Sequence, residues 1–110
     1  MVTQESSVFH AVADPTRRAI LDRLRDGRQA VNEIAGRFEV SRPAISKHLR
    51  VLHAAQLVTE IREGRHRIYQ LNPEPLRDLD RWLDQYRRFW TLNLLSLKKH
   101  VESKEKGRKQ

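Results

Sequence analysis

The segment VNEIAGRFEVSRPAISKHLRVL, residues 31–52, decides the fold of this chain. Its first part, residues 31–38, is a short amphipathic stretch that must pack on its neighbours to be stable. Asn32 is the predicted N-cap of this short helix. After a brief break, Ser41 with Pro43 two residues later marks the start of a second helix. Two helices joined by so tight a turn are typical of a helix-turn-helix motif.

The second helix is predicted over residues 42–55 and has two chemically different sides. Ile45, Leu49 and Leu52 lie at i, i+4 and i+7 and form a narrow apolar stripe. The opposite side carries Arg42, Ala44, Ser46, Lys47 and Arg50. Small residues let a backbone approach DNA closely, and the cations can reach bases or phosphates. This side therefore suits the major groove, with its N-terminal end toward the base edges.

A β-hairpin is predicted directly after the second helix. Residues 57–63 are rich in β-branched side chains, and residues 66–71 alternate polar and apolar side chains. The tip is expected at residues 63–65, where Gly64 allows the turn. An arginine on a narrow hairpin tip can enter a minor groove or lie along the phosphate backbone. Helix, turn, helix and basic hairpin together predict a winged helix-turn-helix fold, mainly α with a small β-hairpin.

Further helices are predicted on both sides of this motif. Residues 7–13 form a short apolar helix candidate. Asp14 before Pro15 is a strong helix start, and Gly27 is a suitable residue to end that helix. A long helix begins at Pro75. Its apolar side chains recur every three or four residues: Leu76, Leu79, Trp82, Leu83, Tyr86, Phe89, Trp90, Leu92, Leu94, Leu97 and Val101.

This long apolar stripe exceeds what a 110-residue monomer needs for its core, and it would leave a large exposed patch. Pairing with a second copy of the chain is the favoured interpretation. Two alternatives stay open. The stripe can belong to an intrachain core, or Trp82, Tyr86, Phe89 and Trp90 can line a pocket for a cofactor or aromatic ligand.

Composition restricts the function classes. The 110 residues contain no cysteine and carry a formal net charge of +8. Disulfides, thiolate zinc sites, iron–sulfur clusters and cysteine catalysis are thereby excluded. The charge excess lies in residues 38–72, which are net +3, and in residues 98–110, which are net +4. A polyanion is therefore the first partner to consider. No segment resembles a membrane span or a signal peptide, so a cytoplasmic location is expected.

The domain prediction follows from the same counts. Residues 1–97 are predicted to form one domain for DNA binding and dimerisation. Residues 98–110, with a single aliphatic side chain, are predicted to form a solvated, flexible basic tail. A non-specific phosphate-binding arm is the alternative role for this tail.

Three segments resemble the ArsR/SmtB family of bacterial winged-helix repressors. They are ADPTRRAIL at residues 13–21, the opening segment at 31–52, and LVTEIREGRHRIYQLNP at 57–73. The resemblance covers residues 7–97. It implies a homodimer, formed through the first and last helices, that binds an inverted-repeat operator and represses transcription. When bound to DNA, such a protein would be associated with the bacterial nucleoid. The resemblance also implies that residues 41–50 read the major groove.

The resemblance supplies candidate site residues. The predicted DNA-binding residues are Ser41, Arg42, Pro43, Ala44, Ser46, Lys47, His48, Arg50, Arg62, Arg65, His66 and Arg67. The predicted dimer interface consists of Val8, Phe9, Val12, Leu76, Leu79, Trp82, Leu83, Tyr86 and Trp90. His48 has two possible roles, packing or phosphate positioning on one hand and direct base contact on the other. The family usually has Gly before the first wing strand, whereas this chain has Gln56, which would be strained in a left-handed conformation.

Metal sensing, which many members of this family perform, is not expected here. The family's sites use paired cysteines on the first helix of the motif, or Asp and His ligands on the last helix. The position of the cysteine pair here reads Ala30-Val31-Asn32, and the last helix, at residues 78–82, lacks the expected histidine after an aspartate. An Asp78–His100 pair across a dimer would supply only two ligands. No metal, no cofactor and no membrane partner is therefore predicted, and any small-molecule effector is unknown.

Two further function classes are retained as alternatives. A winged-helix module can bind RNA or a protein partner instead of double-stranded DNA. An enzyme is the third class, but no paired carboxylates in an apolar setting and no Gly-rich phosphate loop are visible. Ser46 and His48 stand two residues apart on a helix and so point in different directions, which excludes a catalytic dyad between them.

Overall fold

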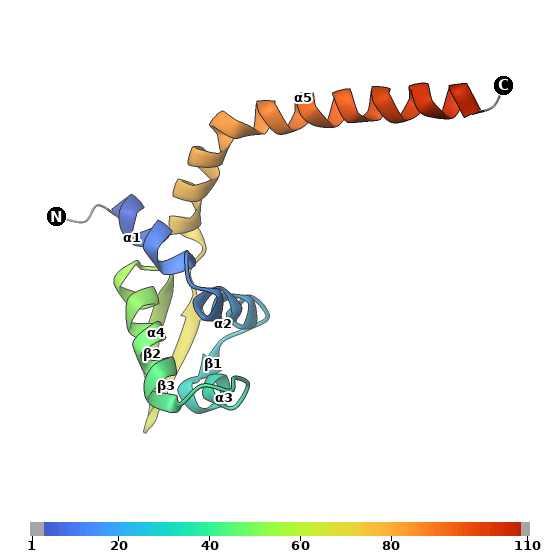
Figure 1. Cartoon of the computed structure of the whole chain (residues 1–110). Coiled ribbons are helices and arrows are strands. Elements are labelled where there is room, and N and C mark those ends of the chain that lie inside the picture. The colour runs from blue at the N-terminus through green and yellow to red at the C-terminus, as the bar shows by residue number, and fades with distance from the viewer. Residues whose placement is uncertain (1–3, 109–110) are drawn as a thin grey trace. The chain divides into compact units, whose positions relative to one another are not determined.

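The computed structural model describes the backbone of residues 4–108 and the side chains of residues 7–92, 97, 98 and 101 (Figure 1). Helices dominate, and a small antiparallel sheet accompanies them, which confirms the predicted fold class. In chain order the elements are α1 (Gln4–Val12), α2 (Pro15–Arg25), β1 (Gln29–Ala30), α3 (Val31–Ala35), α4 (Arg42–Ala54), β2 (Val58–Glu63), β3 (His66–Leu71), the 3-10 turn η1 (Glu74–Leu76) and α5 (Arg77–Arg108).

The wing is a three-stranded sheet in the order β1-β3-β2, one strand more than the sequence predicts. Strands β2 and β3 form the expected hairpin, with Glu63 opposite His66 and Gly64 in a left-handed conformation at φ 64°. The extra strand, β1, pairs Gln29 with Tyr69. A two-residue strand has no recognisable alternation, so only its partner strand reveals it.

Local capping chemistry sets the helix starts. A side-chain oxygen of Asp14 accepts a hydrogen bond from the backbone N–H of Arg17 at 3.0 Å and caps α2. The Ser41 hydroxyl accepts one from the backbone N–H of Ala44 at 3.3 Å and caps α4. Both caps confirm the predictions. Each side chain satisfies a backbone donor that the first helical turn leaves unpaired.

The predicted cap of α3 is wrong. Asn32 lies inside the helix and is exposed, while Ala30 occupies the N-cap position. An Ala side chain cannot accept a hydrogen bond. The Glu33 carboxylate compensates, because it accepts a hydrogen bond from the Ala30 backbone N–H at 3.0 Å. The start of α3 is therefore stabilised from inside the helix.

One apolar core holds the helices and the sheet together. The apolar stripe predicted for α4 is fully used, since Ile45, Leu49 and Leu52 are at most 1% exposed. The buried cluster consists of Ala11, Ile20, Leu21, Leu24, Val31, Ile34, Ile45, Leu49, Leu52, Ala55, Leu57, Val58 and Tyr69. Because α1, α2, α3, α4, β2 and β3 all contribute to it, the core fixes the side of α4 that faces outward.

A boundary between two units falls between Leu79 and Asp80, within α5. Helix α5 continues to Arg108, so most of the predicted tail is helical. The predicted boundary at residue 97 and the role of the tail stay predictions. Among the described residues, no helix has the length and apolar character that a membrane span requires.

Candidate nucleic-acid interface

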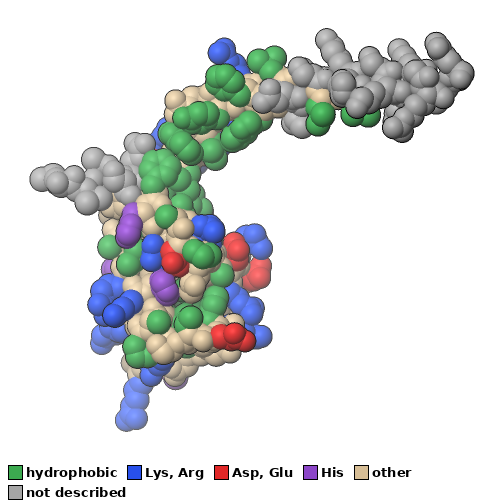
Figure 2. Space-filling model, viewed as in Figure 1, with side chains coloured by type: hydrophobic (Ala, Val, Ile, Leu, Met, Phe, Trp, Pro, Cys, Tyr) green, Lys and Arg blue, Asp and Glu red, His purple; other side chains and the backbone are tan. Residues whose placement is uncertain are grey.

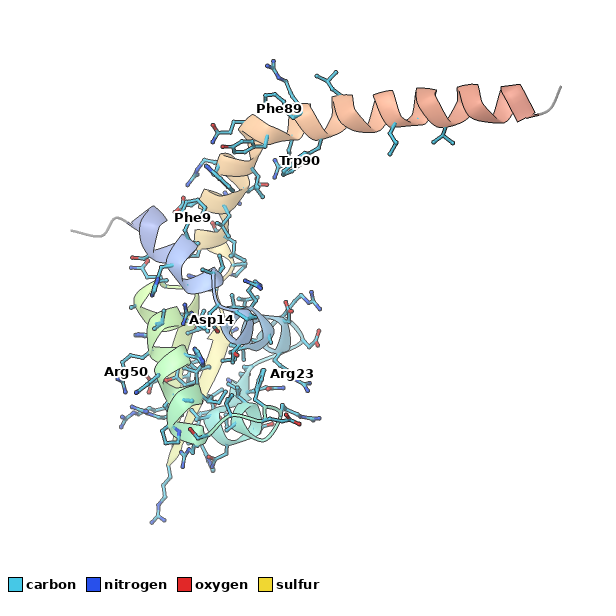
Figure 3. All side chains as sticks on the ribbon, in the orientation of Figure 1. Phe9, Asp14, Arg23, Arg50, Phe89 and Trp90 are labelled. Carbon is cyan, nitrogen blue, oxygen red and sulfur yellow. The ribbon has the colours of Figure 1, made fainter. Side chains whose placement is uncertain are left out.

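The outward side of α4 carries the cations that the sequence assigned to DNA binding. Arg42, Lys47 and Arg50 are exposed, while Ala44 and Ser46 are half-buried between them. Figure 3 shows Arg50 extending away from α4. Burial of the apolar stripe leaves this side to solvent. The result is a cationic helix surface with short side chains at its N-terminal end.

His48 lies on a different side of α4, against the start of α2. Its Nδ1 atom is 3.4 Å from a guanidinium nitrogen of Arg17 and 3.8 Å from a carboxylate oxygen of Asp14. The His48 side chain is only 21% exposed. This position fits packing and positioning better than base contact. Its role at DNA stays a prediction.

Arg17, which the sequence did not single out, joins three helices. Its guanidinium donates hydrogen bonds to the backbone carbonyls of Ala11 at 2.7 Å and His10 at 2.9 Å, at the end of α1. The same group contacts His48 on α4. The backbone N–H of Arg17 and the nearby His48 hold the pKa of Asp14 below its usual value. No sequence signal separates Arg17 from a solvated arginine, because its partners come together only in the fold.

The wing presents the second set of cations. Arg62, Arg65, His66 and Arg67 are all exposed. The Glu60 carboxylate holds two of them, with 3.1 Å to Nε of Arg67 and 3.9 Å to Nε of Arg62. Glu60, which was not predicted as a site residue, thus lies within ion-pair distance of both arginines.

Helix α4, the proposed DNA-reading helix, and the wing meet along a groove. It is lined by Ser46, Arg50, His53, Glu60, Arg67 and Tyr69. At its base, burial and the Glu60 charge raise the pKa of Tyr69. Figure 2 shows Lys and Arg side chains gathered along α4 and down to the end of the hairpin. The fold thus joins the two predicted cationic segments into one surface, which can contact a polyanion over both elements.

The predicted dimer residues divide into two groups. Val8 is completely buried in its own chain, which leaves no side-chain surface for a partner. Phe9, Val12, Leu76, Leu79 and Leu83 are half-buried. On α5, by contrast, Trp82, Tyr86 and Trp90 are 40% to 49% exposed. Phe89, absent from the predicted interface, is more exposed at 60%.

The alternative of a ligand pocket at these aromatic residues stays a prediction. Trp82 and Tyr86 form an edge-to-face pair with ring centroids 5.1 Å apart. One hollow on this helix is lined by Arg87, Arg88, Thr91 and Leu92. The described part of α5 thus presents exposed aromatic surface.

Potential metal ligands do not converge in the described part of the chain. Within it, no group of three or more His, Asp or Glu side chains is placed to hold an ion. The side chain of His100, half of the pair considered from the sequence, lies outside the described side chains.

Comparison with known proteins connects this geometry to a family. Residues 14–60 match the model of the arsR family of bacterial regulatory proteins. The chain is 46% identical over 95 residues to the HTH-type transcriptional regulator Rv2034 of Mycobacterium tuberculosis, covering 86% of each chain. It is 41% identical to the transcriptional repressor SdpR of Bacillus subtilis, covering 71% of this chain and 87% of that protein.

Among solved structures, the chain is similar to an ArsR-like transcriptional regulator from Rhodococcus. The TM-score is 0.67 at 35% identity, covering 87% of this chain and 91% of that one. The matched family segment contains Asp14, Arg17, Ser41, all of α4 and the start of the wing. The matched family segment therefore includes the cationic helix α4 and ends before the cations of the wing.

Proposed function

This chain belongs to the ArsR family of bacterial regulatory proteins, and from that premise we propose that it is a homodimeric repressor that binds an inverted-repeat DNA operator. Its relatives are transcriptional regulators and repressors, so the chain is a transcriptional regulator and not an enzyme. The single observation that supports DNA as the partner is the exposed cationic side of α4 beside the cationic wing.

In this proposal α4 enters the major groove with its N-terminal end toward the bases. Lys47 and Arg50 can reach bases or phosphates, and Arg42 in the first turn lies close enough to the groove to contact a base or the backbone. The half-buried Ala44 and Ser46 let the helix approach closely. Arg65, at the hairpin tip, contacts the neighbouring backbone or minor groove.

The exposed aromatic side of α5 supports a homodimer. Apolar patches of this kind on a soluble regulator usually mark a protein interface. The most exposed aromatic side chains are Phe89 at 60% and Trp90 at 49%. A two-fold axis would place two copies of α4 in successive major grooves, about 34 Å apart. The inverted repeat of the operator would mirror that symmetry.

We further propose that DNA release does not depend on a metal. The absence of cysteine from all 110 residues supports this part, because thiolates are the ligands that soft metal ions prefer. Adding Zn²⁺ or arsenite to the protein–operator complex should leave the affinity unchanged. A drop of tenfold or more with either ion would contradict the proposal.

A mobility-shift titration tests operator binding. The probe is DNA from the promoter region of the protein's own gene, and the control is the same DNA with its inverted repeat scrambled. We expect the intact repeat to bind at least about 10³-fold more tightly. Affinity should fall steeply with salt, because the protein displaces counterions from several phosphates. Equal affinity for both DNAs would overturn the proposal.

Charge reversal tests which surface binds. Replacing Lys47 and Arg50 together by Glu should abolish operator binding. The matched control, Arg23→Glu with Arg25→Glu, makes the same charge change in the last turn of α2. Figure 3 shows Arg23 on α2, away from the reading helix. If the α4 double variant binds as well as the α2 control, with both folded by circular dichroism, α4 does not read DNA.

A further inference from the structure

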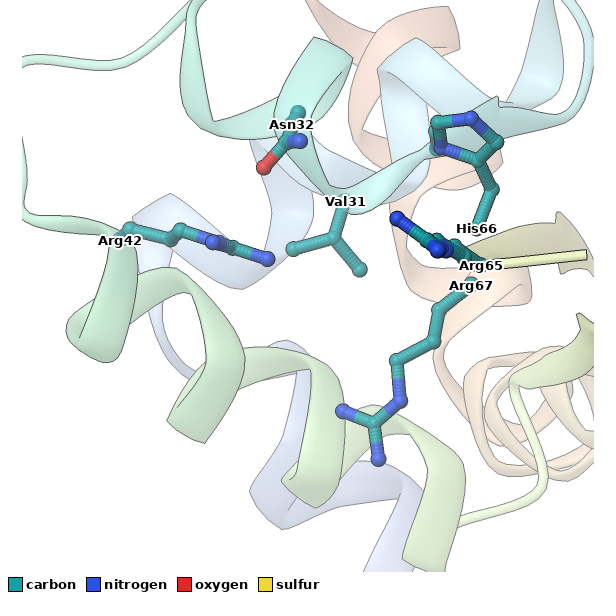
Figure 4. Close-up of a pocket in the computed structure, with 7 residues that line it drawn as sticks. Val31, Asn32, Arg42, Arg65, His66 and Arg67 are labelled. Carbon is teal, nitrogen blue, oxygen red and sulfur yellow. The ribbon is translucent and has the colours of Figure 1, made fainter.

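A pocket lined by three arginines, one histidine and the start of α3 lies where α4, the wing and α3 meet (Figure 4). Arg42 reaches it from the first turn of α4, and Arg65, His66 and Arg67 reach it from the hairpin. In Figure 4 the guanidinium groups of Arg42 and Arg65 extend toward Val31 from opposite sides. Two separate chain segments, α4 and the hairpin, thus bring arginine side chains to one small space beside α3.

The charges of this pocket are not balanced from within. None of its lining residues is acidic. Arg67 has the Glu60 carboxylate at 3.1 Å. Within the part of the chain that the structure describes, neither Arg42 nor Arg65 has an ion-pair partner. Like charges held close together repel each other, so an anion placed among them would be stabilised.

We propose that this pocket binds a phosphate group. The inference rests on the proposed DNA binding and deepens it. Guanidinium groups donate pairs of hydrogen bonds in a planar fork that matches the oxygens of a phosphate. Asn32, also in the lining, carries an amide that can donate another hydrogen bond. A tetrahedral oxyanion can accept from all of these groups at once.

Two sources can supply this phosphate. One is the DNA backbone, whose phosphate would tie the start of α4 to the wing and so set the register of the helix in the groove. The other is a free inorganic oxyanion. Because both would use the Arg42 and Arg65 donors, a free oxyanion would compete with DNA and lower operator affinity.

The first experiment measures the pocket without DNA. Inorganic phosphate is titrated into the full chain at constant ionic strength, with chloride as the reference, while the amide signals of residues 30–32 are followed by NMR. We expect saturable shifts in the wild type. Arg42→Gln with Arg65→Gln should weaken this binding at least tenfold. Arg25→Gln also removes one positive charge, but at the exposed end of α2, and should leave phosphate binding unchanged.

The second experiment measures the salt dependence of operator binding with the same variants. Each lost phosphate contact lowers the slope of log affinity against log salt by about one. We expect that reduction for Arg42→Gln and for Arg65→Gln, but not for Arg25→Gln. Phosphate added at constant ionic strength should also weaken wild-type operator binding if free oxyanions are a source.

The outcomes separate the two sources. A loss of slope without binding of free phosphate assigns the pocket to the DNA backbone alone. Free phosphate binding without a loss of slope assigns it to an oxyanion effector. If neither the loss of slope nor the binding of free phosphate is observed, the inference is overturned. If the wild type binds no operator at all, the proposed function fails, and the NMR titration alone decides the pocket.

Discussion

Helices α4 and α5 have the same kind of apolar periodicity, but the apolar side chains are buried on α4 and exposed on α5. On α4 the stripe of Ile45, Leu49 and Leu52 is at most 1% exposed. On α5 the corresponding large side chains, such as Phe89 at 60% and Trp90 at 49%, face solvent. Periodicity indicates that a helix has an apolar side, but not what covers it. The chain covers α4 itself, and in our proposal a second copy covers α5.

The largest expected effect of a single substitution lies on α4. Leu49→Ala removes a fully packed side chain and should lower the free energy of unfolding by about 3 kcal/mol, because the cavity collapses only partly. Urea unfolding measures the loss. Val40→Ala, at an apolar side chain that is 39% exposed, is the control and should change stability by less than about 0.5 kcal/mol. Equal losses would mean that the α4 stripe is not the core.

The next effect should appear in assembly rather than in folding. Trp90→Ala should raise the dimer dissociation constant about 30-fold, since a buried interface tryptophan contributes about 2 kcal/mol or more. Analytical ultracentrifugation over a concentration series measures this shift. The neighbouring exposed residue Thr91 provides the control, as Thr91→Ala, with little expected change. A wild-type protein that stays monomeric at high concentration would break the comparison between α4 and α5.

A smaller effect concerns the end of α4. Gln56 follows this helix with φ at 62°, a conformation that suits glycine. Gln56→Gly should therefore raise the free energy of unfolding by about 0.5 kcal/mol, once the greater freedom of glycine in the unfolded chain is subtracted. Gln70→Gly in strand β3 is the control and should destabilise the protein by about 0.5 to 1 kcal/mol. Thermal unfolding of both variants checks the difference in sign.

The smallest effect is a pH dependence at the start of α2. The pKa of Asp14 is lowered in the folded state, chiefly by the hydrogen bond from the Arg17 backbone N–H. A lowered carboxyl pKa contributes stability above the unfolded pKa of about 4, and that contribution is lost as pH falls through the folded pKa. The stability difference between wild type and Asp14→Asn, in which the cap remains, should therefore be larger at pH 7 than at pH 3.

Asp22→Asn, an exposed change on the same helix, controls for the general effect of pH on unfolding. Urea titrations at both pH values give the comparison. If the stability difference between wild type and Asp14→Asn stays constant from pH 7 to pH 3, the charge of Asp14 does not stabilise the start of α2.

The success of the sequence predictions depended on the range of the interactions involved. Asp14 and Ser41 were identified as caps because each bonds a backbone N–H three residues away. Arg17 was missed because its partner His48 lies 31 residues further along the chain. Strand β1 was missed for the same reason, since it exists only by pairing with β3. The predicted Asn32 cap of α3 was wrong because Ala30 is the N-cap residue and the Glu33 side chain, from inside the helix, accepts the hydrogen bond of the Ala30 backbone N–H.

The sequence by itself determined the positions of most helices, the basic hairpin, the family and the cationic chemistry of the reading helix. These depend on capping, periodicity and turn residues, which act over a few neighbours. Only the tertiary structure decided that Arg17 and Asp14 contact His48, that Glu60 pairs with Arg67, and that Arg42 and Arg65 line one pocket with Val31. These contacts and shared linings involve residues far apart in the sequence, and only the packing of the apolar core brings their segments together.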